Sequence, residues 1–340
     1  MCIRDRPYTK PVGEVLTCEL VSDVTGEKMA CSVKQLTIRN QYEIGFQPTS
    51  PGRYHLHVKV EEEHIKESPF AVTVIRKLGT PIKIIGDLKG PWGVVIDQKG
   101  NVIVAENGKD SCVSIISPTG ENIMSFGDSP SRMFNNFIGL AVDDDGNILV
   151  SNAKHREIQK FTSDGECINF SRSPQSGRLY GFAIHPLTKE VYVANRYDHL
   201  LEILNPELKF SSNFCSQGSE NGQFQFPWDV AFDSSGNMYV ADTWNRCIPV
   251  FNAKKEFIRR IGERELGFPS SICIDSSDVV YVTDDCMHCV SVFTCEGDLL
   301  TSFGGYGSEP GQFNLPRGVA VDKSGVVYVS DHKNNRLQLF

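Results

Sequence analysis

The chain has 340 residues, of which 40% are hydrophobic, and 34 Lys and Arg against 42 Asp and Glu give a formal net charge of −8 at pH 7. No apolar run is long enough to span a bilayer and no signal-peptide pattern is present, which is typical of a soluble globular protein of about two domains. The excess of acidic residues lies from residue 80 onward, where the sequence has 32 Asp and Glu and 23 Lys and Arg. This balance argues against a dedicated nucleic-acid binder, which usually presents a basic surface to phosphates.

Residues 1–10 are interpreted as a leader that is non-native or disordered. The opening text MCIRDR has neither the apolar core nor the cleavage site of a secretory signal. The domain that follows also begins in the middle of its expected pattern, so we assign residues 1–10 to no folded domain.

Residues 11–75 are predicted to form short strands separated by turns. The alternation of large apolar and polar residues from Tyr54 to Val58 is the pattern of a half-buried antiparallel strand. The text TSPGRYHLHV from Thr49 and the later SPF from Ser68 resemble the closing part of a filamin-type immunoglobulin-like repeat. That resemblance implies a β-sandwich of roughly 100 residues. The segment is therefore expected to be a truncated domain without its first one or two strands.

Residues 76–80 are a short linker, and from residue 81 to residue 340 the sequence repeats. When the last residue of each predicted first strand is placed in register, six positions align: Asp97, Asp143, His185, Asp233, Asp275 and Asp322, at spacings of 46, 42, 48, 42 and 47 residues. Units of this length with strand patterns and no helical pattern predict an all-β fold, a six-bladed β-propeller.

The text of the units is also shared, as FPWDVAFDSSGNMYVAD from Phe226 and LPRGVAVDKSGVVYVSD from Leu315 illustrate. These segments resemble the NHL repeat. The sequence ends at Phe340 after a third strand, whereas residues 81–86 have the pattern of a fourth strand. We therefore predict that residues 81–86 complete the last blade and close the ring, which removes the free sheet edges.

A filamin-type repeat followed by six NHL repeats resembles the C-terminal half of tripartite-motif proteins of the NHL class (TRIM-NHL), which are E3 ubiquitin ligases. In that family the RING, B-box and coiled-coil segments lie upstream, and none of their zinc-ligand ladders occurs in this sequence. The resemblance implies a target-recognition module. We therefore expect no catalytic residue, no metal and no cofactor in this chain.

The resemblance places partner binding on the face that carries the turn before each first strand and the loop between the second and third strands. The turn positions are Trp92, Ile138, Tyr180, Trp228, Ser270 and Arg317. The loop positions are Lys109, Lys154, His155, Arg156, Arg196, Tyr197, Trp244, Arg246, His288, Lys333 and Arg336. Aromatic and basic groups of this kind stack on bases and also form protein-interaction hot spots. For Trp92 and Trp228, packing between neighbouring sheets is an equal alternative.

Three functions remain open at this point. The acidic balance favours a protein partner, whereas the aromatic and basic rim favours single-stranded or hairpin RNA; no membrane partner is expected. Six-bladed propellers also include metal-dependent lyases and lactonases. Against that third function, the inner strands are apolar and His185 alone replaces the repeated Asp, where we expect a turn or core residue.

Eleven cysteines are scattered over both domains without a paired ladder, which is typical of reduced thiols and predicts a cytoplasmic location. The segment Cys286–Cys289 is the one local Cys/His cluster, but a second pair at zinc-site spacing is missing. The acidic run Asp143–Asn147 is predicted to be a hairpin turn and not a calcium loop, because the terminal Glu of such a loop is absent.

Overall fold

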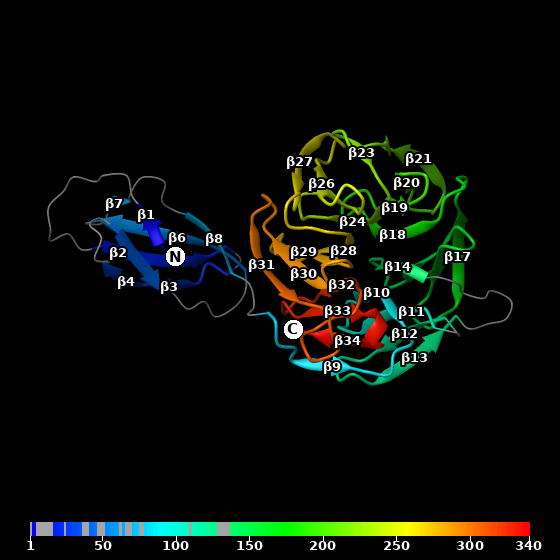
Figure 1. Ribbon diagram of the computed structural model, residues 1–340, viewed down its shortest axis with the longest axis horizontal. Helices are drawn as coiled ribbons and strands as arrows, with labels where there is room; N and C mark the ends of the chain where they lie inside the picture. The colour runs from blue at the N-terminus through cyan, green and yellow to red at the C-terminus, as the bar shows by residue number, and fades with distance from the viewer. Residues whose placement is uncertain are drawn as a thin grey trace. The chain divides into compact units, whose positions relative to one another are not determined.

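The computed structural model describes residues 2–4, 16–23, 25–35, 41–45, 52–60, 63–64, 70–74, 78–108, 111–127 and 137–340. The chain divides into two units, Met1–Lys77 and Leu78–Phe340, which we describe separately. Both units consist of β-strands (Figure 1). No helix in the described part of the chain has the length and apolar character that a membrane span requires.

The described residues of the N-terminal unit form two antiparallel sheets, with strand orders β3–β2–β6–β7, where β8 also pairs with β6, and β1–β5–β4. Their bounds are β1 (Cys2–Arg4), β2 (Leu16–Ser22), β3 (Lys28–Ala30), β4 (Ser32–Gln35), β5 (Gln41–Gly45), β6 (Gly52–Val60), β7 (Glu63–His64) and β8 (Phe70–Val74). Along β6, Tyr54, Leu56 and Val58 are buried and His55 is exposed, which confirms the predicted alternation. Ile44 from the other sheet packs against these side chains, so the two sheets share one core.

Six four-stranded sheets, blades 1 to 6, make up the second unit and surround a common axis (Figure 1). Blades 1 to 3 comprise β10 (Pro91–Ile96), β11 (Val102–Glu106), β12 (Cys112–Ile116), β13 (Asn122–Phe126); β14 (Phe137–Val142), β15 (Ile148–Asn152), β16 (Glu157–Phe161), β17 (Cys167–Arg172); and β18 (Leu179–Ile184), β19 (Val191–Asn195), β20 (Leu200–Leu204), β21 (Phe210–Phe214). Blades 4 to 6 comprise β24 (Pro227–Phe232), β25 (Met238–Asp242), β26 (Ile248–Phe251), β27 (Phe257–Ile261); β28 (Pro269–Ile274), β29 (Val280–Asp284), β30 (Cys289–Phe293), β31 (Leu299–Gly304); and β32 (Pro316–Val321), β33 (Val327–Asp331), β34 (Arg336–Leu339), β9 (Lys83–Ile85). Short parallel strands β22 (Ser216–Gln217) and β23 (Gln223–Phe224) precede blade 4, and a 3-10 helix, η2 (His332–Asn334), precedes β34. The predicted all-β, six-bladed propeller is thereby confirmed.

The ring closes through the strand that precedes blade 1. β9 pairs antiparallel with β34, with Ile85 opposite Leu337 and Lys83 opposite Leu339. The innermost strands contact one another in sequence from β10 to β32, and β32 contacts β10. Each sheet therefore has a neighbour of its own kind on both sides, which covers faces that a lone sheet would expose.

The repeated Asp fixes the hairpin between the first and second strands of a blade. In blade 4, Asp233 Oδ1 accepts hydrogen bonds from the backbone N–H groups of Ser235 (2.9 Å) and Asn237 (2.8 Å), while Gly236 adopts a φ of 79°. His185 takes this role in blade 3, because its Nδ1 accepts from Leu187 N (3.1 Å) and Thr188 N (3.2 Å). The predicted turn role of His185 is confirmed. The Asp143–Asn147 segment forms the same turn.

Candidate functional site

One end of the propeller carries both classes of predicted binding position. In every blade the residue that begins the first strand pairs with the residue that ends the second, as Pro91 does with Glu106 and Pro227 with Asp242. The turn before the first strand and the loop after the second strand therefore lie at the same end of each sheet. We call this end the loop face, and the opposite end, which carries the Asp hairpins, the hairpin face.

At the centre of the loop face, five side chains form a cluster that we call the central plug: Trp92, Tyr180, Arg196, Trp228 and Arg317. The indole rings of Trp92 and Trp228, from blades 1 and 4, stack with 6.3 Å between their centroids and 10° between their planes. The Tyr180 ring meets Trp228 edge-on at 5.0 Å. Because blades 1 and 4 are opposite each other in a six-bladed ring, this stack crosses the axis.

Two guanidinium groups complete the plug. Arg196 Cζ lies 3.9 Å from the Trp228 ring centroid and 5.2 Å from that of Tyr180. Arg317 Cζ lies 4.5 Å from the Trp92 ring and 4.7 Å from the Trp228 ring, and its guanidinium forms an ion pair with Asp285. Burial lowers the pKa of Arg196 and of Arg317, although both keep an arginine's charge. Such cation–π contacts strengthen as water is removed from around them.

The plug has two guanidinium groups, those of Arg196 and Arg317, and the carboxylate of Asp285 forms an ion pair with the second of them. In the part of the chain that the structure describes, three N–H groups of the plug are buried without an acceptor, those of Trp92 Nε1, Arg196 Nε and Arg317 Nε. Asp285 Oδ1 is likewise buried without a donor. An anionic or hydrogen-bond-accepting group would find donors here.

Beside the plug lies a second cluster, the aromatic ridge, which consists of Tyr197, Phe226 and Trp244. The ring centroid of Phe226 lies 6.1 Å from that of Tyr197 and 5.0 Å from that of Trp244. Tyr197 is 49% exposed and Trp244 is 57% exposed. Arg178, which is exposed, places its Cζ 5.8 Å from the Tyr197 ring. The ridge is thus an accessible aromatic surface beside an exposed cation.

The remaining predicted binding residues differ in their surroundings. Lys154, Arg246 and Lys333 are exposed on the loops that follow the second strands. Arg156 donates to the carbonyl of Gln175 (2.8 Å). Arg336 donates to Asp331 Oδ2 (2.7 Å) and to the carbonyls at positions 309 and 312, so it anchors the loop before blade 6. Lys109 lies outside the described residues.

Acidic residues of the same loops are engaged within them. Asp284 is 0% exposed and accepts from the backbone N–H groups of Gly267 (2.6 Å), Phe268 (3.0 Å) and Met287 (2.9 Å). Asp242, 1% exposed, accepts from Gln225 N (2.7 Å) and Asn245 Nδ2 (2.6 Å). Burial raises the pKa of Asp242 to about 7. These carboxylates thus hold the backbone of the loops in place, whereas the basic side chains Lys154, Arg246 and Lys333 are exposed.

Sequence reasoning missed three residues of this end of the ring. Phe226 belongs to the ridge and Arg178 lies beside it although neither occupies a predicted position, and only their place just before the first strand of a blade points to them. Asp229 lines the central cavity and was not recognised as a cavity residue. Its signal was the text PWDV from Pro227, where four other repeats have Gly in place of the Asp.

Among the residues that the structure describes, no group of three or more His, Cys, Asp and Glu side chains is arranged to hold a metal ion. His288, in the CMHC segment, uses its Nδ1 to accept from the backbone N–H of Leu315 (3.2 Å). Burial raises the pKa of the thiols of Cys215, Cys247 and Cys273 to about 12, which keeps them protonated near neutral pH.

The fold and this face define a six-bladed β-propeller of the repeat-built class. The NHL repeat family matches residues 224–251, 266–293 and 313–340, and the Filamin/ABP280 repeat family matches residues 8–71. The chain thus carries NHL repeats and a filamin repeat, which confirms both predicted resemblances.

Comparison with known proteins points the same way. The chain is 30% identical over 120 residues to the E3 ubiquitin-protein ligase TRIM71 of Xenopus tropicalis, a TRIM-NHL protein; the match covers 32% of this chain and 14% of that relative. A streptogramin B lyase structure is similar with a TM-score of 0.58 at 14% identity over 76% of this chain and 96% of its own. A Bacteroides thetaiotaomicron protein of unknown function gives 0.62 at 13% identity over 95% and 90%. At these identities the structures show the fold alone.

Proposed function

We propose that the propeller is a non-catalytic target-recognition module that captures a protein partner on its loop face. The observation that carries this proposal is the aromatic ridge, in which Tyr197 and Trp244 expose about half of their surface. Trp, Tyr and Arg are the residues in which binding free energy concentrates at protein interfaces. Large aromatic side chains that are held in a fixed arrangement and still exposed to solvent are typical of partner-binding surfaces.

The similarity to TRIM71 supports a place for this module in a ubiquitin ligase of the TRIM-NHL type. In such a molecule the propeller would select the target, and a RING domain elsewhere in the protein would perform the ligase step. The unpaired N–H groups of the plug favour a partner that presents an acidic or acceptor side chain toward the axis.

The double variant Tyr197→Ala/Trp244→Ala tests the proposal. Proteins enriched from cell extract on the wild-type chain should be depleted about tenfold or more on this variant, because both anchor side chains are gone. Leu187→Ala is the matched control, since Leu187 is 70% exposed on the hairpin face. An unchanged set of enriched proteins on the double variant would contradict the proposal.

RNA binding is the second candidate, supported by the exposed cations Lys154, Arg178, Arg246 and Lys333 on the same face as the aromatic rings. A ridge of aromatic side chains beside basic ones can stack bases and neutralise phosphates. Binding of short RNA hairpins should then weaken steeply as salt concentration rises, because phosphate contacts release counterions. Absent binding, or binding that ignores ionic strength, would eliminate this candidate.

A further inference from the structure

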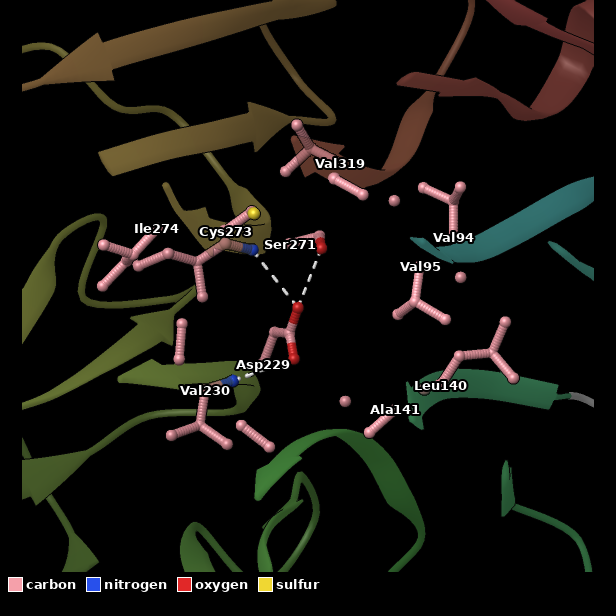
Figure 2. Close-up of a pocket in the computed structure, with 18 of the residues that line it drawn as sticks. Val94, Val95, Leu140, Ala141, Asp229, Val230, Ser271, Cys273, Ile274 and Val319 are labelled. Carbon is pink, nitrogen blue, oxygen red and sulfur yellow. Dashed lines mark hydrogen bonds between the residues drawn. The ribbon is translucent and has the colours of Figure 1, made fainter. Parts of the chain in front are cut away.

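The axis of the propeller contains a cavity of about 550 Å³ that all six first strands line. Figure 2 shows side chains from several of these strands converging on it. Its wall is mostly small and apolar, with Val95, Ala141, Ala183 and Cys273 among its residues. A volume of this size is within the range of small-molecule sites.

The cavity has a closed end and an open end. Trp92, Trp228 and Arg317, which belong to the plug, line it at the loop face. At the hairpin face its lining includes Ser234 and Ser276, both of which are exposed to solvent. From Asp229 to Phe232, where β24 ends, are three steps of about 3.3 Å, and Ser234 lies in the turn beyond, so the closed end is at least about 10 Å from the opening. A ligand would enter from the hairpin face.

Asp229 stands near the closed end and points into the cavity (Figure 2). Its Oδ2 accepts from Ser271 Oγ (2.8 Å) and Ile272 N (3.2 Å), whereas Oδ1 accepts only from Val230 N (2.9 Å) among the hydrogen bonds of the described residues. Blade 3 makes room for this carboxylate: a Cβ on Gly181 would lie 2.1 Å from Asp229 Oδ1. Since Oδ1 accepts one hydrogen bond and has two lone pairs, it can accept one more.

No cation balances this carboxylate within the cavity. Among the described lining residues Arg317 is the one with a positive charge, and its guanidinium pairs with Asp285. The other titratable groups of the wall are Cys273, whose thiol is protonated, and the hairpin carboxylates Asp233 and Asp275, which are held by their own turns. Burial raises the pKa of Asp229 to about 7, which reflects the cost of a lone charge in this place.

We propose that the central cavity binds a small organic ammonium ion, with its N–H donors on Asp229 Oδ1 and a compact apolar body against the wall. A primary ammonium ion supplies a positive charge to balance the Asp229 carboxylate and N–H donors for its Oδ1 atom. A metal ion would need several more oxygen or nitrogen ligands than this wall provides. An anion would face the carboxylate, and a neutral apolar molecule would leave it unpaired.

The test compares 2-phenylethylamine with the near-isosteric alcohol 2-phenylethanol on the full chain by isothermal titration calorimetry at about pH 8, where Asp229 is ionised and the amine is protonated. The amine should bind about tenfold or more tightly than the alcohol, because its hydrogen bond to Asp229 is charge-assisted. Equal affinities, or no binding of the amine, would overturn the proposal without any variant.

Asp229→Asn supplies the second arm, since it keeps the side-chain shape and removes the charge. The preference for the amine should disappear in this variant and remain in Asp145→Asn, which removes an exposed carboxylate at the hairpin face.

The pH dependence of binding is the third arm. In the wild-type chain the amine should bind about tenfold more weakly at pH 6 than at pH 8, because Asp229, with a pKa of about 7, is mostly protonated at pH 6. Amine binding that survives Asp229→Asn, or that is insensitive to pH over this range, would contradict the assignment.

Discussion

The central plug and the aromatic ridge are made of the same residue types and lie on the same face, yet they differ in what surrounds them. Trp228 in the plug is 9% exposed and contacts two arginines, whereas Trp244 in the ridge is 57% exposed. The difference comes from position along the blade radius: the first strand leads to the axis, where six blades converge, and the loop after the second strand lies further out. A Trp at the axis therefore seals the ring, and a Trp further out remains available to a partner.

The largest effect should come from Trp228→Ala in the plug. This change removes the ring that Trp92, Tyr180, Arg196 and Arg317 all contact. Truncation of a buried Trp costs about 3–5 kcal/mol of unfolding free energy. Urea unfolding of the propeller measures the loss, and a change below about 1 kcal/mol would show that the plug does not hold the ring.

Arg317→Leu should destabilise the propeller by about 3 kcal/mol, because it leaves the Asp285 carboxylate buried without its partner. The Arg317 and Asp285 side chains are only 12% and 14% exposed, so solvent screens the pair weakly. The double variant Arg317→Leu/Asp285→Asn should recover part of the stability. A double variant as unstable as the sum of its two single changes would argue against a coupled pair.

The ridge should respond to pH through His199, whose ring contacts Phe226. His199 Nδ1 accepts from the backbone N–H of Phe226 (3.1 Å), and its ring lies 4.3 Å from the Phe226 ring. Burial lowers the pKa of His199 below 6.5, so the folded state prefers the neutral imidazole. The stabilisation is complete above about pH 6.5 and is lost as pH falls through the lower folded-state pKa.

His199→Asn is the matched variant for this prediction. Asn335 holds the same left-handed position in blade 6, and its Oδ1 accepts from Gly90 N (2.9 Å). An Asn at position 199 should therefore keep the contact to Phe226 N without titrating. Thermal unfolding between about pH 7.5 and pH 5.5 should fall less steeply for the variant than for the wild type; parallel curves would contradict the role given to His199.

The smallest effect on stability should come from Trp244→Ala in the ridge. Its side chain is largely exposed and its ring contacts Phe226 alone among the aromatic pairs of the described residues. Surface substitutions of this kind stay within about 0.5 kcal/mol. The free energy of unfolding should thus be nearly unchanged while partner capture is lost. A loss above about 1 kcal/mol would place Trp244 in the structural part of the face.

Local and repeated features of this molecule could be predicted from the sequence, and contacts between blades could not. The Asp hairpins, including the His185 substitute, depend on residues within a few positions of one another and recur six times. The stack of Trp92 on Trp228 joins segments far apart in the chain and depends on the width of the channel. The anchoring role of Arg336 likewise depends on where the loop at positions 309–312 passes.

Acrylamide quenching of tryptophan fluorescence tests the division between plug and ridge most directly, since the chain has three Trp, at positions 92, 228 and 244. In Trp244→Phe only the two plug residues emit. We predict a blue-shifted emission and a much lower quenching constant than in the wild type, because the two remaining rings stack on each other within the ring of blades. A variant that is quenched as readily as the wild type would contradict the account.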